Sequence, residues 1–514
     1  MAKVDPRIEE LREMRAKAQQ GGGQDRIDRQ HAKGKLTARE RLDLLLDSGS
    51  FVELEPYTTQ QYDPEGKAYL GDGVVTGFGT VDGRTVYVYA QDFTVQGGAL
   101  GEMHSRKICR VMDLAVSNGC PIIGLIDSGG ARIQEGVKSL GGYAEIFKRN
   151  ARYSGVVPQI SLILGPCAGG AAYSPALTDL IIMVEKQSFM FLTGPQVIKT
   201  VTGEETDFES LGGAQVHLNV SGTAHLSTKD EESALKLARY ALGYLPSNNV
   251  ENAPRKPGGD SPDRSALELN DLVPLDLGAP YSMHAAINAV VDQGSFLELQ
   301  AGYARNAIVG LARFDGMPVG IIAQEPSVMA GVIDINAADK ICRTVRFCDA
   351  FNLPLVTFVD SPGFLPGIGQ EHGGIIRHGA KVLFAYSEAN VPKVSVVTGK
   401  GYGGAYIVMS SKYLGTDVNY AWPSAEIAVM GPKGATNILY RKEIASAEDP
   451  DAERQRLETE YRKQYLSPYA AAEAGFVDDV IEPAETRPMV IKALKAIQNK
   501  SEQHPPRKHG NMPV

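Results

Sequence analysis

Four glycine-rich segments hold the residues best placed to do chemistry: 127–132 (DSGGAR), 165–176 (GPCAGGAAYSPA), 360–367 (DSPGFLPG) and 399–410 (GKGYGGAYIVMS). Each follows a short apolar run and precedes residues typical of the start of a helix. Glycine allows positive φ and lets a ligand approach the backbone, and the first N–H groups of a helix have no partner inside it. Such amides stabilise charge that develops on an oxygen atom during a reaction. The segments therefore predict oxyanion-binding turns.

The remaining candidates for catalysis have structural interpretations that we favour. His372 and His378 lie near the third segment and could exchange protons, but hydrogen-bonded structural histidines are the commoner case. Asp127 and Asp360 stand directly before the glycine turns, where an aspartate more often shapes a turn than acts as a base. Cys167 has no matching histidine and is expected to fill the core. No G-x-x-x-x-G-K-[ST], G-x-S-x-G or H-E-x-x-H motif occurs, which argues against ATPase, serine-hydrolase and zinc-protease sites.

The chain repeats itself, and the repeat defines two domains. Residues 77–130 align without a gap to 310–363, and 16 of the 54 positions are identical. The segment 247–266 is rich in Pro, Gly, Asn and Asp, as linkers are. We therefore expect a first domain over 1–256 and a second over 257–514.

Alternating strand and helix patterns predict an α/β fold in each copy. Residues 74–92 read as a hairpin that turns on Asp82-Gly83, and 98–119 has helical periodicity and ends at a glycine. Two strand–turn–helix units follow, each passing through one glycine-rich segment. Residues 451–475 read as a further helix with solvated charges.

Composition restricts the partners and the compartment. The 514 residues carry a net charge of −9, which leaves no broad basic surface for nucleic acid. The five cysteines form no C-x-x-C pair, so we expect neither disulfides nor a bound metal. The start of the chain resembles a charged helix and not a signal peptide. No apolar run is long enough to insert into a membrane, and we expect a cytoplasmic protein.

Long motifs extend over nearly the whole chain, among them GKLTARERL (34–42), QDFTVQGG (91–98), FLTGPQVIKTVTGE (191–204), GGIIRHGAK (373–381) and YAWPSAEIAVMGPKGA (420–435). Together with the glycine-rich segments, they resemble the carboxyltransferase (β) subunits of biotin-dependent acyl-CoA carboxylases of the propionyl-CoA type. They are also similar to the transcarboxylase 12S subunit and to the α subunit of sodium-pumping methylmalonyl-CoA decarboxylases.

The resemblance implies two tandem crotonase-like domains and a homo-hexamer. Acyl-CoA would bind the N-terminal half of one subunit, and biotin the C-terminal half of its partner. The carboxyl group would pass from N-carboxybiotin to the α-carbon of a short acyl-CoA, with propionyl-CoA giving methylmalonyl-CoA. No lysine hairpin for biotin attachment is present. Biotin would therefore arrive on a separate biotin carboxylase and biotin carrier (alpha) subunit.

The same resemblance assigns roles to individual residues. The backbone groups implied in catalysis are those of Ala131, Gly169, Gly170, Gly403 and Gly404. Residues implied in substrate binding are Gly130, Tyr143, Ile407 and Ala405. Those implied in biotin binding are Phe364, Gly363 and Leu365. Many propionyl-type enzymes carry an acid at the position of Ile407, so the acyl preference stays open.

Three alternatives remain at this point. The first is the reverse transfer, in a sodium-pumping methylmalonyl-CoA decarboxylase. The second is a hydratase or isomerase of the crotonase group that uses Glu135 as its base. The third is an inactive assembly scaffold, which the four intact glycine segments disfavour.

Overall fold

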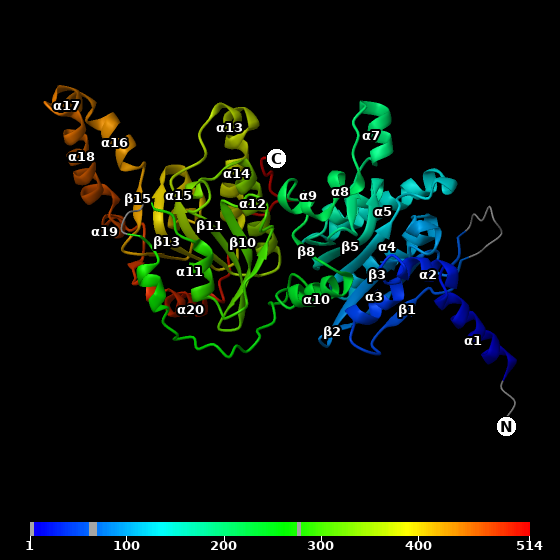
Figure 1. Ribbon diagram of the computed structural model, residues 1–514. Coiled ribbons are helices and arrows are strands. Elements are labelled where there is room, and N and C mark those ends of the chain that lie inside the picture. The colour runs from blue at the N-terminus through cyan, green and yellow to red at the C-terminus, as the bar shows by residue number, and fades with distance from the viewer. Residues whose placement is uncertain (1–4, 61–68, 275–278) are drawn as a thin grey trace. The chain divides into compact units, whose positions relative to one another are not determined.

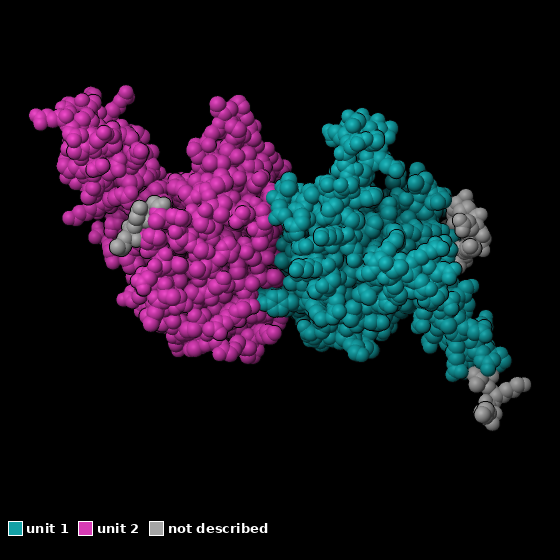
Figure 2. Space-filling model, viewed as in Figure 1, with its two compact units in different colours: residues 1–251 teal, residues 252–514 magenta. Residues whose placement is uncertain are grey.

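A computed structural model describes residues 5–60, 69–274 and 279–514. The chain divides into two compact units, Met1–Glu251 and Asn252–Val514, coloured separately in Figure 2. The division lies inside the 247–266 segment whose composition predicts a linker.

Unit 1 is built on an eight-stranded sheet with the order β1-β2-β3-β4-β5-β6-β8, and β7 pairs with β5 (Figure 1). The β1–β2 and β2–β3 pairs are antiparallel, and the others are parallel. Its strands are β1 (Val52–Leu54), β2 (Val74–Val81), β3 (Arg84–Gln91), β4 (Ile122–Ser128), β5 (Gln159–Ala168), β6 (Leu180–Val184), β7 (Phe189–Phe191) and β8 (Leu226–Thr228). Its α-helices are α1 (Pro6–Gln19), α2 (Gln24–His31), α3 (Ala38–Leu45), α4 (Glu102–Ser117), α5 (Val137–Tyr153), α6 (Tyr173–Ala176), α7 (Pro195–Thr202), α8 (Phe208–Gly212), α9 (Ala214–Asn219) and α10 (Glu231–Leu242).

Unit 2 repeats this plan with the order β16-β14-β13-β12-β11-β10-β9, and β15 pairs with β13. Its strands are β9 (Leu297–Leu299), β10 (Ala307–Phe314), β11 (Met317–Gln324), β12 (Leu355–Ser361), β13 (Lys393–Tyr402), β14 (Val418–Ala421), β15 (Glu426–Ala428) and β16 (Asp479–Val480). Its α-helices are α11 (Met283–Val290), α12 (Ile335–Ala350), α13 (Ile368–Gly373), α14 (Ile375–Glu388), α15 (Gly403–Val408), α16 (Pro432–Leu439), α17 (Arg441–Ser446), α18 (Pro450–Tyr461), α19 (Pro468–Glu473) and α20 (Thr486–Ile497).

The duplication seen in the sequence is confirmed element by element. Strands β2, β3 and β4 and helix α4 each recur 233 residues later as β10, β11, β12 and α12, with the same bounds. The predicted hairpin turn is present in both units, because Asp82 and Gly83 take positive φ (+49° and +79°), as do Asp315 and Gly316. Two successive positive φ values are those of a type I′ turn, whose twist suits antiparallel strands.

The central strands are covered on both faces, which accounts for their continuous apolar runs. Every residue of β4 and of its counterpart β12 is buried. In unit 1, α4 packs against α5 and α3 packs against α10. The predicted α/β architecture is confirmed. The glycine turns directly follow β4, β5, β12 and β13, so the packed sheet holds the start of each turn in place.

The helix expected over 451–475 is interrupted. Helix α18 ends at Tyr461, a π-helical turn spans Arg462–Leu466, and α19 begins at Pro468. Proline has no N–H to continue a helical ladder, so the second helix starts anew. Within the described part of the chain, no helix is long and apolar enough to cross a bilayer.

Candidate active site

The first bend of unit 1 follows β4 and presents one backbone amide. Leu100 N donates to Gly130 O at 2.9 Å, and Arg132 N donates to Leu100 O at 2.9 Å. Ala131 lies between these two bonds, and no acceptor for its N–H occurs among the described residues. Gly130 takes a φ of +107°, which only glycine adopts readily. The Ala131 amide is thus held firmly and is available to a ligand.

Unit 2 builds the same bend after β12. Ile333 N donates to Gly363 O at 3.0 Å, and Leu365 N donates to Ile333 O at 2.8 Å. The amide between these bonds belongs to Phe364, and it too has no acceptor in the part of the chain that the structure describes. Phe364 therefore holds the position that Ala131 holds in unit 1. The amide of Leu365 is already bonded, which leaves only its half-buried side chain for a ligand.

The second bend of each unit joins a strand to a helix start. Gly169 follows β5 with a φ of +61°, and Gly403 follows β13 with a φ of +56°. Gly170 and Gly404 come next, in the first turn of a 3₁₀ helix and of α15. N–H groups at such positions have no partner within the helix. A side chain on Gly403 would also be blocked, because its Cβ would lie 2.9 Å from Val429 O.

The two bends of a unit adjoin each other because the strands before them are neighbours. Ser128 pairs with Cys167 at the ends of β4 and β5, and a Cβ on Gly130 would lie 3.0 Å from Ala168 O. In unit 2, Ser361 pairs with Gly401 in the same way. Each unit therefore combines one unpartnered amide from the first bend with a glycine-rich helix start from the second.

Tyr143 of α5 covers the unit 1 bends. A Cβ on Gly170 would lie 3.3 Å from Cδ2 of Tyr143, so glycine is needed for the ring to pack there. The Tyr143 side chain is buried, and its hydroxyl has no hydrogen-bond partner in the described chain. Burial raises its pKa, and the nearby Ser128 hydroxyl offsets this only in part. A buried hydroxyl without a partner is costly, so this hydroxyl is free to bond a ligand at the bends.

The Phe364 ring borders the unit 2 bends. A Cβ on Gly404 would lie 3.7 Å from this ring, and a Cβ on Gly379 would lie 3.0 Å from it. Glycine at these positions keeps space open beside a flat aromatic face. Ile407 of α15 is half exposed, whereas Ala405 is fully buried. Ile407 can contact a ligand through its side chain, and Ala405 only through its backbone.

Comparison with known proteins assigns the family. Residues 29–512 match the family described as the carboxyl transferase domain. The propionyl-CoA carboxylase carboxyltransferase subunit of Haloferax mediterranei is 58% identical over 514 residues, which are 99% of this chain and the whole of that protein. The chain belongs to the carboxyl transferase family.

This carboxyltransferase is also similar to a decarboxylase subunit and to a transcarboxylase of known structure. The methylmalonyl-CoA decarboxylase subunit alpha of Veillonella parvula is 56% identical over 517 residues, the full length of both chains. The transcarboxylase 12S crystal structure with methylmalonyl-coenzyme A bound superposes with a TM-score of 0.97 at 50% identity, covering 100% of this chain and 99% of the other. The expected pair of crotonase-like domains is confirmed by this match.

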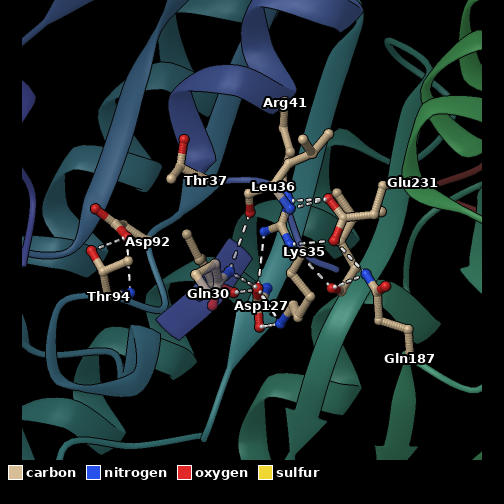
Figure 3. Close-up of polar contacts among 12 residues, drawn as sticks. Gln30, Lys35, Leu36, Thr37, Arg41, Asp92, Thr94, Asp127, Gln187 and Glu231 are labelled. Carbon is tan, nitrogen blue, oxygen red and sulfur yellow. Dashed lines mark hydrogen bonds and ion pairs between the residues drawn. The ribbon is translucent and has the colours of Figure 1, made fainter. Parts of the chain in front are cut away.

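A buried charge cluster lies behind the first bend of unit 1 (Figure 3). Asp127, the residue before Ser128, is inaccessible to solvent and pairs with Lys35 Nζ at 2.7 Å and Arg41 Nη1 at 2.9 Å. Arg41 Nε also pairs with Glu231 at 2.7 Å. Both carboxylate oxygens of Asp127 are thus occupied by cationic donors, which supports its interpretation as a structural residue.

The equivalent Asp360 of unit 2 has different neighbours. Its Oδ1 accepts from Lys400 N at 2.9 Å, and its own N–H donates to Gln324 Oε1 at 3.1 Å. Asp127 N donates to Gln91 Oε1 at 3.2 Å in the same manner. Burial raises the pKa of Asp360. The backbone contacts of the two aspartates are therefore alike, whereas among the described residues only Asp127 forms ion pairs with cationic side chains.

Glu135 is not placed as a free catalytic base. It pairs with Arg132 Nη1 at 2.6 Å and accepts from Glu102 N at 2.6 Å. Arg132 in turn pairs with buried Asp72 at 2.7 Å. These contacts occupy the Glu135 carboxylate in an ion pair with a buried arginine, so it is not free to act as the base of a crotonase-type hydratase.

The candidate residues His372 and His378 differ in their hydrogen-bond partners. His378 Nδ1 lies 2.9 Å from Asp339, which Lys381 also contacts at 2.8 Å, so His378 has a structural partner. No hydrogen bond of His372 occurs among the described residues. Lys35 and Arg41 lie in the GKLTARERL motif (34–42), but their partnership with Asp127 and Glu231 could not be predicted because these residues come from distant segments.

Proposed function

We propose that this carboxyltransferase moves a carboxyl group between biotin on another subunit and the α-carbon of a short acyl-CoA, with propionyl-CoA and methylmalonyl-CoA as the expected pair. The observation that carries the proposal is the duplicated bend, in which the amides of Ala131 and Phe364 are both held with no acceptor among the described residues. During the transfer, negative charge develops on an oxygen of the acyl-CoA and on an oxygen of biotin. Each of these oxygens needs a site that stabilises it, and each unit supplies one such site.

Unit 1 would bind the acyl-CoA. The Ala131 amide and the helix start at Gly169-Gly170 would hold the thioester oxygen, on which charge collects when the α-proton leaves. Gly130 lets the chain approach that oxygen, and the Tyr143 hydroxyl provides a further donor.

Unit 2 would bind biotin, and its residues fit a flat ureido ring. The Phe364 amide and the helix start at Gly403-Gly404 would hold an oxygen atom, while the Phe364 ring borders the space beside Gly404. Carboxylated biotin supplies the carboxyl group and, after its transfer, a nitrogen that accepts the α-proton. This division agrees with the ion pairs that occupy the carboxylates of Asp127 and Glu135, since the transfer then needs no carboxylate base from the chain.

The partners follow from this division. We propose a homo-hexamer that works with a biotin carboxylase and biotin carrier subunit, as the 12S hexamer is described as a multienzyme core. The five cysteines are free thiols, four of them buried, which supports a reducing cytoplasm. Light scattering of the purified chain would give the mass of six subunits.

The deciding experiment mixes the full chain with free biotin and methylmalonyl-CoA. Carboxyl transfer to biotin should release propionyl-CoA in proportion to biotin, and malonyl- and ethylmalonyl-CoA should react more slowly. Propionyl-CoA release that does not depend on biotin would overturn the proposal. Hydration of crotonyl-CoA would instead support the crotonase-type alternative.

A second candidate keeps the site and reverses the direction. The 56% identity to a methylmalonyl-CoA decarboxylase alpha subunit favours it specifically. Both directions use the same bends, so purification from the native organism decides between them. A biotin carboxylase partner supports the carboxylase, and a partner with several membrane spans supports the decarboxylase.

A further inference from the structure

Arg132 directly follows Ala131, and its guanidinium is enclosed by the protein. The side chain is 2% exposed, and its Nη1 pairs with Asp72 at 2.7 Å and with Glu135 at 2.6 Å. Its Nη2 donates to Ala99 O at 3.0 Å. A buried guanidinium that is bonded to two carboxylates and a carbonyl has a fixed orientation. Arg132 therefore holds one side of the first bend of unit 1 in place.

The two carboxylates also hold the start of helix α4. Glu135 Oε2 accepts from Glu102 N at 2.6 Å, and Asp72 Oδ2 accepts from His104 N at 2.8 Å. The residue before the helix, Gly101, has no side chain that could cap these N–H groups. The start of α4 is therefore anchored to the same carboxylates that bind the arginine.

These contacts fix both partners of the bridge that presents the Ala131 amide. Leu100 lies two residues before α4, and its carbonyl oxygen accepts from Arg132 N at 2.9 Å. Arg132 acts on the bend directly, and its carboxylate partners act on Leu100 through α4. The direction of the Ala131 N–H is set by these two segments.

The backbone of Asp72 is strained. Its φ is +48°, in the left-handed region that residues other than glycine seldom adopt, and its side chain is fully buried. His104 holds this conformation at two points, because its N–H bonds to the Asp72 carboxylate and its Nδ1 lies 3.0 Å from Asp72 O. Strain of this kind clusters at functional sites. Here it directs one carboxylate at both the arginine and the helix start.

The equivalent bend of unit 2 is built without an arginine at this position. The offset of 233 residues places Leu365 at the position of Arg132, and a leucine forms no ion pair. Helix α12 is capped locally instead, because the side chain of Asp334 accepts from Ala337 N at 2.8 Å. The arginine and its carboxylates therefore belong to the bend of unit 1, and the bend at Phe364 forms without them.

We propose that Arg132 is a positioning residue for the acyl-CoA half of the reaction, because it fixes the direction of the Ala131 amide toward the thioester oxygen. This inference rests on the proposed function, in which that amide stabilises the charge on the thioester oxygen. A donor that is fixed before the reaction needs no reorganisation when the charge develops. Arg132 itself is enclosed by the protein and acts through the backbone of the bend.

The first test measures the carbonyl stretch of propionyl-CoA, labelled with ¹³C at the thioester carbon, bound to the full-length protein without biotin. A hydrogen bond polarises a carbonyl group and lowers its stretching frequency, so the band should move to lower frequency on binding to the wild type. In Arg132→Met the band should return toward the frequency of free propionyl-CoA. Arg132→Lys should give a smaller shift than the wild type, because an ammonium cannot reproduce the planar fork of the guanidinium. It keeps a cation for the two buried carboxylates, so it provides the test if Arg132→Met does not fold.

The second test measures the biotin-dependent release of propionyl-CoA from methylmalonyl-CoA. Arg132→Met should lower kcat about 10²-fold and leave the KM for biotin within about twofold of the wild-type value, because a misplaced donor weakens binding of the transition state. Arg132→Lys should recover part of this loss. The matched control Arg149→Met removes an arginine of α5 that pairs with Asp113 at 2.7 Å. Its carbonyl band and its kcat should equal those of the wild type.

Three outcomes separate this inference from the proposed function. If the band shifts equally in the wild type and in the folded Arg132 variants, Arg132 does not position the amide, and the proposed function is retained. If Arg149→Met loses the shift as the Arg132 variants do, the effect is a general loss of stability, which also overturns the role of Arg132. If the wild type shows no shift, the bend does not hold the thioester oxygen, and the proposed function is rejected together with the inference.

Discussion

The Nη1 atom of Arg41 lies 2.9 Å from Oδ2 of Asp127, and neither side chain is reached by solvent. Lys35 and Glu231 complete this cluster, which joins α2–α3, the end of β4 and the start of α10. The capping box of α3, formed by Thr37 and Glu40, fixes the helix that carries Arg41. The bend that presents Ala131 thus rests on a buried network whose charges balance within it.

Arg41→Met should strongly destabilise unit 1. The substitution leaves Glu231 without its cation and Asp127 with Lys35 alone, and breaking a buried pair costs about 3–5 kcal/mol. Urea unfolding followed by far-UV circular dichroism would measure the loss in the free energy of unfolding.

Arg39→Met is the matched control, because it alters the same helix two residues away. Arg39 pairs with Glu53 at 2.8 Å on a partly exposed surface, where a pair contributes below about 1 kcal/mol. Similar losses in both variants would contradict the special role of the buried cluster.

The glycine turns could be predicted because their causes are local. Positive φ at Gly130, Gly169 and Gly403 and the helix starts after β5 and β13 follow from residues next to one another. The internal repeat then indicated which glycine turn of unit 1 is equivalent to which turn of unit 2. The offset of 233 residues also pairs Ala131 with Phe364, but only the two bridges show that each of these amides is left between two bonded neighbours.

The charge cluster could not be predicted, because its members lie far apart in the chain. Asp127 follows Arg41 by 86 residues, and Glu231 follows it by 190. Each of these residues taken alone is a plausible surface charge. Only packing of α3 and α10 on the sheet brings them together.

Valine at Gly170 or Gly404 should abolish carboxyl transfer without unfolding the protein. A branched side chain at Gly170 meets the Tyr143 ring, and one at Gly404 fills the space beside Phe364. Loss of an oxyanion donor lowers turnover about 10²–10³-fold. Steady-state assays should show impaired use of acyl-CoA for the first variant and of biotin for the second.

Gly141→Val provides the control for both valine variants. A Cβ on Gly141 of α5 would meet no atom within 4 Å. Its activity should stay within about twofold of the wild type. Full activity of Gly170→Val and Gly404→Val in folded protein would refute the assignment of both bends.

Unit 2 should lose stability between pH 7 and pH 10 through His284. Hydrogen bonds with Glu298 and Glu325 raise its pKa to about 9, against burial. Because the folded pKa exceeds the unfolded value near 6.5, the stabilisation is complete below pH 6.5 and disappears as the pH rises through 9. His284 is partly exposed, so solvent screening limits the effect to about 1 kcal/mol.

Calorimetry of wild type and His284→Gln at several pH values checks this dependence. The wild-type melting temperature should exceed that of the variant at pH 7, and the two should converge near pH 10. Glu325 stays charged throughout, since its pKa is lowered to about 2 by bonds from His284 and Ser327 that outweigh burial. If the difference in melting temperature stayed constant from pH 7 to pH 10, the stabilisation by His284 would not depend on its charge.

Tyr143→Phe should separate stability from activity. Its hydroxyl is buried without a partner among the described residues, so removing it should leave the free energy of unfolding unchanged or raise it by about 1 kcal/mol. The control Tyr153→Phe loses a bond from Tyr153 Oη to Asp113 at 2.6 Å and should lose about 1 kcal/mol of stability. If the Tyr143 hydroxyl donates to the acyl substrate, its removal lowers kcat/KM about tenfold with propionyl-CoA, an effect of about 1.4 kcal/mol. A destabilised Tyr143→Phe protein with unchanged kcat/KM would place the hydroxyl in the core and remove it from the substrate site.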